Sequence, residues 1–494
     1  MKRTSRLLIA VVTLCSTYTL SAQVITSPEK NTADKWDLRR CVEYALANNL
    51  QVLQSRIQAS LADVDKAQSR WQQYPTADFN HNTGLQWGRS IDPTTNQFTS
   101  NQLLYQGFNL SAGVTVFNWH RIRNNMMASR WAAEAAHTDV EKMKNDVALN
   151  VATYYLQVLL ARQQVEIAQV QMHQTFSQLE VARKKVAAGA VPELDALTLE
   201  GQYATDSSAY ISALATEDQN LLQLKQVLNI DAGQPFDITT PPADQIPVEP
   251  LLQLQPETVF ELARYNQPAQ KANEQRIKSL EASMKSSRAA LFPTISVGGS
   301  LATNFSSPDK DFQQIITGYN PSPAYVEFNG NKYNLYSPDI EQESTKKTFS
   351  ERWDGWGNQM NNNFRQSFGL SIAIPINSGG QARFNYARSK LNLKNAAVIR
   401  SQADQTLKND IYKAYYSAHA ALQKFNAAKT SVAITQKAYD FAKKRYDLGL
   451  LNTFDLIISN NNLSRAKLDL AAAQFDYVFK MKVLEFYKGQ GIKL

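Results

Sequence analysis

The chain has 494 residues, of which 19% are charged, and its formal net charge at pH 7 is +8. This mild excess comes without a basic stripe interleaved with aromatic side chains, so the composition offers no argument for nucleic-acid binding. Beyond the amino-terminal segment no apolar run reaches the roughly 20 residues of a membrane-spanning helix. If the chain enters a membrane, it has to do so as β-strands.

Residues 1–22 have the order of a secretory signal peptide. Three basic residues, Lys2, Arg3 and Arg6, precede a short apolar run, and small residues follow as far as Ala22. We expect cleavage near Ala22, because the apolar run is too short for a transmembrane anchor. Removing this segment lowers the formal net charge from +8 to +5.

The chain contains two cysteines. Cys15 lies in the signal peptide, where Leu14 is bulkier than the small residue that usually precedes a lipidated cysteine. Lipidation is therefore disfavoured, although the sequence leaves it open. Cys41 is the only cysteine of the mature chain, so we predict no intrachain disulfide despite an oxidising destination.

An internal repeat organises the rest of the chain. Six residues of the first half recur 218 positions later in the second half, as Ala45, Asn48, Ser69, Arg70, Pro75, Thr76 and then Ala263, Asn266, Ser287, Arg288, Pro293, Thr294. Farther along the offset is about 260, as between Gly189 and Gly449. The offset grows because segment 89–107 is replaced by segment 305–363, which is 40 residues longer. A duplication with one enlarged loop explains both offsets.

The duplication divides the mature chain into two repeats. We predict a first repeat at 23–230 and a second at 257–490, joined by a linker at 231–256. The linker contains six prolines, which forbid a continuous helix there. Each repeat is predicted to contain a helix, two strands, a long helix and a returning helix.

The long helices are predicted at 119–187 and 381–447, with returning helices at 192–229 and 453–488. Apolar residues at alternating steps of four and three follow each long helix, beginning with Val147, Val151, Tyr154, Val158 in the first and Ile411, Ala414, Ala418, Ala421 in the second. This spacing is typical of a coiled-coil seam. At 1.5 Å per residue each long helix extends roughly 100 Å, the dimension of a rod or tube.

Four segments with period-two alternation lie between the helices, at 76–88, 108–118, 294–305 and 364–376. Each is about 11 residues long, with one apolar and one polar face, as in a tilted transmembrane strand. An amphipathic sheet in a soluble protein is the alternative for any one of them. Four strands cannot close a barrel, since the smallest bacterial barrels need about eight, so we predict that several chains share one barrel.

The chain resembles the TolC family of outer-membrane efflux and secretion proteins over nearly all of its mature length. The shared features are the duplication, the junctions Tyr74-Pro75-Thr76 and Phe292-Pro293-Thr294, and two Gly-x(5)-Asp turns at 189–195 and 449–455. The resemblance implies an α+β fold in which a long α-helical coiled-coil barrel continues into a transmembrane β-barrel shared by a homotrimer, with four strands from each protomer.

The resemblance also implies a function in the outer membrane, extending into the periplasm. We expect a passive exit duct, in contact with outer-membrane lipid, that receives substrates from a periplasmic adaptor and an inner-membrane pump. Small molecules such as drugs are the expected cargo. A duct for type I protein secretion and a periplasmic coiled coil or adhesin without a pore are the alternatives.

The turns between the long and returning helices are the candidate adaptor contacts. Gly189 and Gly449 follow basic helix ends, so a left-handed glycine that ends each helix is expected. Small or apolar residues follow them, namely Ala190, Val191, Leu450 and Leu451. In the family such turns form the periplasmic tips that adaptor hairpins contact.

Three further residues are the candidate pore and gate. Asp195 and Asp455 begin the returning helices, where a carboxylate is favourable, and the resemblance implies carboxylate rings at the tunnel mouth. Leu451 stands where an Arg of the family latches the closed gate, and Ile458 stands where a second Asp is found. We therefore expect an apolar latch between Tyr446 and Leu451 in place of an ionic one.

Pro75 and Pro293 lie where the period changes from 3.6 to 2, which predicts swivels between the helical and strand regions. The aromatic insert 305–363 is expected to be a long extracellular loop that either caps the pore, meets a surface partner or is simply mobile. The five histidines have no metal-binding spacing, and no nucleophile motif, P-loop or dinucleotide fingerprint is present. We expect no enzyme, no metal and no cofactor.

Overall fold

The computed structural model describes residues 35–91, 98–99, 102–240, 249–377 and 379–489. The signal-peptide prediction and Cys15 lie outside these residues. The elements of the first repeat are α2 (Leu38–Asn48), α3 (Leu50–Trp71), β1 (Thr76–Gln86), β2 (Ser90–Ile91), β3 (Phe98–Thr99), β4 (Leu103–Phe117), α4 (Arg121–Ala187) and α5 (Glu193–Leu228).

The second repeat follows the same order with additions. Its elements are η3 (Leu251–Gln253), α6 (Pro256–Asn266), α7 (Pro268–Ala289), β5 (Thr294–Pro308), β6 (Lys310–Phe328), β7 (Asn331–Lys346), η4 (Glu351–Trp353), α8 (Trp356–Asn362), β8 (Arg365–Ala373), α9 (Gln381–Asp447) and α10 (Thr453–Lys488). None of the described helices is both long and apolar enough to cross a membrane.

Equivalent helices of the two repeats have equal lengths. The pairs α2 and α6, α3 and α7, α4 and α9, and α5 and α10 contain 11, 22, 67 and 36 residues. The first helix of each repeat is broken in two at a matching point. The side chain of Asn49 caps α3, and Pro268 begins α7, where a missing N–H costs nothing.

Four antiparallel strands form one sheet in the order β1-β4-β5-β8. The register aligns polar residues with polar residues, as in the row Asp78, Ser111, Ser300 and Ser367. The next row on the opposite face aligns Phe79, Leu110 and Leu301. The sheet therefore has one polar and one largely apolar face, because successive side chains point to opposite sides.

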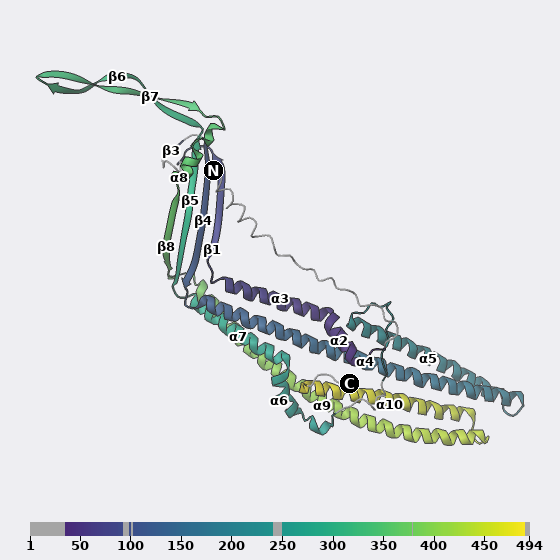
Figure 1. The fold of residues 1–494 in the computed structure, drawn as a ribbon. Helices are drawn as coiled ribbons and strands as arrows, with labels where there is room; N and C mark the ends of the chain where they lie inside the picture. The colour runs from purple at the N-terminus through teal and green to yellow at the C-terminus, as the bar shows by residue number, and fades with distance from the viewer. Residues whose placement is uncertain (1–34, 92–97, 100–101, 241–248, 378, 490–494) are drawn as a thin grey trace.

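The helices next to the sheet follow the strand order, and they leave the end of the sheet at an angle to the strands (Figure 1). Helix α4 lies between α3 and α7, and α7 lies between α4 and α9. Farther from the sheet, α5 packs on α4, and α10 packs on α9 and α4. The result is an open, curved layer whose two edges are β1 with α3 and β8 with α9.

The main hydrophobic cores lie where the short helices α2 and α6 cover the long ones. One cluster joins α2, α4 and α5 around residues such as Cys41, Tyr155 and Leu159, all almost inaccessible to solvent. A second joins α6, α9 and α10 around Val259, Ile411 and others. Burial raises the pKa of the Cys41 thiol to about 12.

The insert 305–363, expected as an extracellular loop, is largely folded. Strand β5 continues to Pro308, and β6 and β7 form a two-stranded antiparallel ribbon that projects away from the sheet (Figure 1). Its turn is Asn329-Gly330, with φ of 51° and 76°, the residue pair that a two-residue hairpin turn prefers. The Asn-Gly pair is the sequence signal for a β-hairpin, and the loop prediction missed it.

The remainder of the insert packs back on the end of the sheet. The Trp353 ring stacks on Phe305 with centroids 5.5 Å apart, and Trp356 donates a hydrogen bond to the Gln106 side chain at 2.7 Å. The buried Arg352 guanidinium donates to Gln102 Oε1 at 3.0 Å. Strand β4 accordingly begins at Leu103 and not at 108, because its first residues are covered by this cap.

Candidate functional site

The two turns at the far ends of the long helices have the same backbone hydrogen bonds. After α4, Gly189 adopts φ +71° and Ala190 N–H donates to the Lys185 carbonyl at 2.9 Å. After α9, Gly449 adopts φ +73° and Leu450 N–H donates to the Arg445 carbonyl at 2.8 Å. These bonds form the Schellman motif, which satisfies the last carbonyls of each helix and requires a left-handed residue. The glycines stand in that position.

The predicted tip residues differ in exposure. Ala190 and Leu450 are exposed, whereas Val191 and Leu451 are half-buried. The two turns thus place one accessible small or apolar residue beside each glycine. This gives the tips the accessible edge that contact with a helical hairpin needs, without assigning a partner.

Asp195 and Asp455 lie in the first turns of α5 and α10. Asp195 is half-buried, and its N–H donates to the Pro192 carbonyl at 3.1 Å. Asp455 is exposed, and its N–H donates to the Asn452 side chain at 2.8 Å, which caps α10. A carboxylate in either place is favoured by the helix dipole, so its position is explained locally.

Tyr446 and Leu451 lie at one small cluster formed by Tyr439, Leu456 and Leu463. Helices α9 and α10 form one helical hairpin, and α4 and α5 form the other. Within one chain the side chains of Tyr446 and Leu451 therefore pack on the core of the hairpin of α9 and α10. The Lys185 ammonium of the other hairpin lies 5.1 Å from the centre of the Tyr446 ring. This cation–π contact joins the two tips, and sequence reasoning missed it. The signal was the basic end of α4, which was assigned only to the helix dipole.

Polar side chains of α4, α5 and α9 gather where the two helical hairpins face each other. Asp206 of α5 is buried and accepts hydrogen bonds from Thr175 Oγ1 at 2.6 Å and Gln202 Nε2 at 2.8 Å. Across the gap, Gln178 Nε2 donates to the Tyr439 hydroxyl at 3.2 Å. The buried Asn460 Oδ1 accepts no hydrogen bond from any residue that the structure describes. Separating polar surfaces of this kind costs less than separating an apolar core, because water replaces the lost bonds.

Pro75 and Pro293 occupy equivalent junctions between helix and strand. At each, a three-residue turn ends the helix, with Tyr74 N–H donating to the Trp71 carbonyl at 3.0 Å and Phe292 N–H to Ala289 at 3.2 Å. Aromatic rings surround the junctions. Trp71 lies 5.2 Å from Tyr74, and Trp119 lies 4.8 Å from Phe292, between ring centres.

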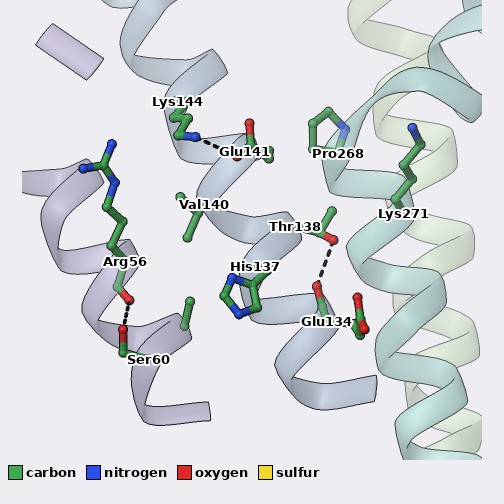
Figure 2. A pocket seen from close by; sticks show the side chains of 11 residues that line it. Arg56, Ser60, Glu134, His137, Thr138, Val140, Glu141, Lys144, Pro268 and Lys271 are labelled. Atoms are coloured by element: carbon green, nitrogen blue, oxygen red, sulfur yellow. Dashed lines mark hydrogen bonds and ion pairs between the residues drawn. The ribbon is translucent and has the colours of Figure 1, made fainter. Parts of the chain in front are cut away.

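A hollow of about 620 Å³ opens between α3, α4 and α7 (Figure 2). Its lining carries both signs of charge, with Arg56, Lys144 and Lys271 opposed by Glu134 and Glu141. None of the candidate tip, gate or swivel residues lines it. Among the residues that the structure describes, no three His, Cys, Asp or Glu side chains gather as a metal site.

The sequence matches the family model described as outer membrane efflux protein over residues 41–229 and 259–484. The chain belongs to this family. The two matched segments correspond to the two repeats, with the gap at the proline-rich linker. The family places this efflux protein in the cell outer membrane.

Individual similarities to members of the family are distant. The outer membrane protein TolC of Escherichia coli (strain K12) is 21% identical over 67% of this chain, but the match spans only 58% of TolC itself. The toxin and drug export protein A of Aggregatibacter actinomycetemcomitans is 19% identical over 89% of this chain and 83% of its own length. The CmeC outer membrane channel of Campylobacter jejuni superimposes with a TM-score of 0.68 at 17% identity, over 95% of this chain and 94% of that one. This structural likeness shows the shared fold.

Proposed function

We propose that three copies of this outer-membrane efflux protein form a passive exit duct that crosses the outer membrane and the periplasm. The observation that carries the proposal is the continuous layer in which strand order and helix order agree. Among the described residues of a single chain both edges of this layer are unpaired, and β8 is exposed along its whole length. Edge strands left open in this way recruit another chain. Three copies supply twelve strands, enough to close a barrel.

The two faces of the sheet suit a wall between lipid and water. The apolar face carries large side chains that stay exposed among the described residues of one chain, including Phe79, Phe368 and Leu370. The polar face carries Asp78, Asn80 and Asn82. The aromatic rings at the helix–strand junctions match the girdle that such barrels place at a membrane–water interface. In this arrangement the helices extend into the periplasm.

The tips are the proposed site of adaptor contact and gating. Gly189, Ala190, Gly449 and Leu450 would meet a periplasmic adaptor bound to an inner-membrane pump. In the trimer, Asp195 and Asp455 would each supply a carboxylate ring that favours cations.

The latch between the tips is proposed to be non-ionic. The Tyr446 ring, held by Lys185 and packed beside Leu451, takes the place of the missing Arg. Opening the gate then requires the two hairpins to part along their polar contact.

Planar-bilayer recording of the purified mature chain tests the duct and its gate. We expect a detergent-dependent trimer that gives cation-selective currents, with selectivity reduced in Asp455→Ala and unchanged in Asp469→Ala, an exposed position farther along α10. Unchanged selectivity in Asp455→Ala would reject the carboxylate ring. A monomer soluble without detergent would reject the duct and favour a periplasmic coiled coil or adhesin.

Small molecules are the proposed substrates, with protein secretion as the second candidate. The Aggregatibacter relative is named a toxin and drug export protein, which includes small molecules among what it exports. Deleting the gene should lower the inhibitory concentrations of several unrelated compounds and leave secreted proteins unchanged. The opposite pattern would favour secretion.

A further inference from the structure

We propose that Arg365 is an anion-binding residue inside the barrel, where three copies supply a ring of three guanidinium groups. The ligand class is an anionic group, such as a phosphate or a carboxylate, on a molecule that passes through the duct. This inference rests on the proposed duct, and it names a residue that selects what crosses the membrane-spanning part.

The four-stranded sheet carries very few charged side chains. Of all the residues in β1, β4, β5 and β8, only Asp78 and Arg365 are acidic or strongly basic. The register places Arg365 in one row with Ala302, Asn109 and Asn80, and it places Asp78 in the next row of the same face. Both charges therefore lie on the polar face, which is the face toward water in the proposed barrel.

Arg365 stands apart from the acidic residue of the sheet. Asp78 lies on the opposite edge strand, three strand spacings or roughly 14 Å across the sheet. Among the residues that the structure describes, no carboxylate forms an ion pair with Arg365, and this side chain is exposed. Within one chain it is therefore a positive charge that a ligand can reach.

A hollow of about 360 Å³ beside Arg365 gives an anion room to approach. It lies on the polar face of the outer half of the sheet, and Asn82 and Asn109 line it together with Arg365. None of the described residues that line it is acidic. Asparagine side chains supply neutral N–H donors, which suit an anion already held by a guanidinium.

Two glycines shape this hollow. A Cβ at Gly107 would collide with the Asn82 side chain, and a Cβ at Gly84 would collide with the Tyr105 ring. The absence of these two Cβ atoms lets the Asn82 amide and the Tyr105 ring lie along the wall. The amide is thereby held low on the sheet, and the space in front of Arg365 stays open.

A guanidinium in this place suits an anion for two reasons. Its planar fork of N–H groups can donate two parallel hydrogen bonds to a phosphate or a carboxylate. Rings of arginine or lysine are also the devices by which pores favour anions. The charge acts over about 10 Å at 0.1 M ionic strength, so it acts most strongly on molecules close to the wall.

Planar-bilayer recording with tripolyphosphate tests the ring, in about 0.1 M KCl so that screening stays weak. Added on the side of the barrel, this multivalent anion should block the unmodified channel at a concentration at least tenfold lower than in Arg365→Gln. Arg365→Lys keeps the charge and should retain most of the block. Lys332→Gln removes a positive charge from the β6–β7 ribbon instead, and it should leave the block unchanged.

A second pair of variants neutralises the same charge without changing Arg365. Ala302 pairs directly with Arg365 across β5 and β8, which places their Cβ atoms about 5 Å apart. Ala302→Asp should weaken the block as Arg365→Gln does, because the new carboxylate pairs with the guanidinium. Ala302→Asn has nearly the same size and should not.

Each outcome decides a different point. A conducting trimer that tripolyphosphate blocks equally in all variants, or does not block at all, would overturn the anion ring and leave the duct standing. A block at least tenfold stronger in Asp78→Asn would show that Asp78 of a neighbouring copy neutralises the ring, which would also overturn it. If Arg365→Gln fails to assemble, the two Ala302 variants decide. A chain that forms no conducting pore would overturn the proposed duct, and the ring with it.

Discussion

The centre and the edges of the layer are built from the same repeat but carry opposite side chains. Helix α7, in the centre, buries Ala282 and Ala289, each only 4% exposed. The equivalent residues of α3, at the edge, are Val64 and Trp71, which are 63% and 70% exposed. Small residues let helices inside a chain approach closely, while large apolar residues at the edge remain uncovered. Alanine at these positions of α7 therefore marks a helix buried inside the chain, and large apolar residues at the same positions of α3 mark the surface that another copy has to cover.

The largest effect is expected from a charge on the apolar face of the edge strand. Leu370→Arg should abolish trimer formation, because an arginine in the membrane costs about 2–4 kcal/mol in each copy. Ser371→Arg, one residue along on the polar face, should still assemble. Light scattering in detergent measures both. Equal assembly of the two variants would contradict the distinction between the faces.

In the interior, Leu159→Ala should lower the free energy of unfolding by about 2–5 kcal/mol, because it leaves a cavity in the core between α2, α4 and α5. The matched change Leu222→Ala, at a half-exposed position of α5, should cost less than about 1 kcal/mol. Denaturant titrations compare them. A similar loss in both would show that this core does not dominate stability.

At the tips, Gly189→Ala and Gly449→Ala should each destabilise by about 1–2 kcal/mol, because an L-residue is strained at positive φ. There is open space around both glycines, so the backbone alone decides the cost. Gly201→Ala inside α5 also meets no neighbour and should instead stabilise by up to about 1 kcal/mol. Melting temperatures should move in opposite directions, and a common direction would refute the backbone argument.

The smallest effect is expected at the contact between the tips. Lys185→Met removes a cation–π interaction worth about 0.5–1 kcal/mol and should raise the open probability of the channel a few-fold. Tyr446→Phe keeps the ring and should behave like the unmodified chain. Single-channel recording distinguishes them. A latch that depends on the tyrosine hydroxyl would instead be released by Tyr446→Phe.

The repeat and the strand faces could be predicted from sequence because both depend on local spacing. The row of Asp78, Ser111, Ser300 and Ser367 is a consequence of period-two patterns that can be counted along the chain. The strand ends could not be predicted as well. Residues 103–107 pair in β4 partly because Trp353 and Arg352, about 250 residues away, cover this end of the sheet.

The tip contacts needed tertiary information for the same reason. Nothing near Lys185 in the sequence indicates that it lies over Tyr446, and nothing near Thr175 indicates that it bonds Asp206. The first pair depends on how the two helical hairpins lie together, and the second depends on how α4 and α5 pack within one hairpin. Sequence spacing describes each helix but not how the helices pack against one another.

The ribbon of β6 and β7 is long enough to reach well beyond the membrane. Its 19-residue first strand extends about 60 Å at the usual rise per residue, and its base is fixed by the buried Arg352. In the proposed assembly three such ribbons stand outside the bacterium. A peptide epitope inserted at the Asn329-Gly330 turn would then be accessible to antibodies on living cells.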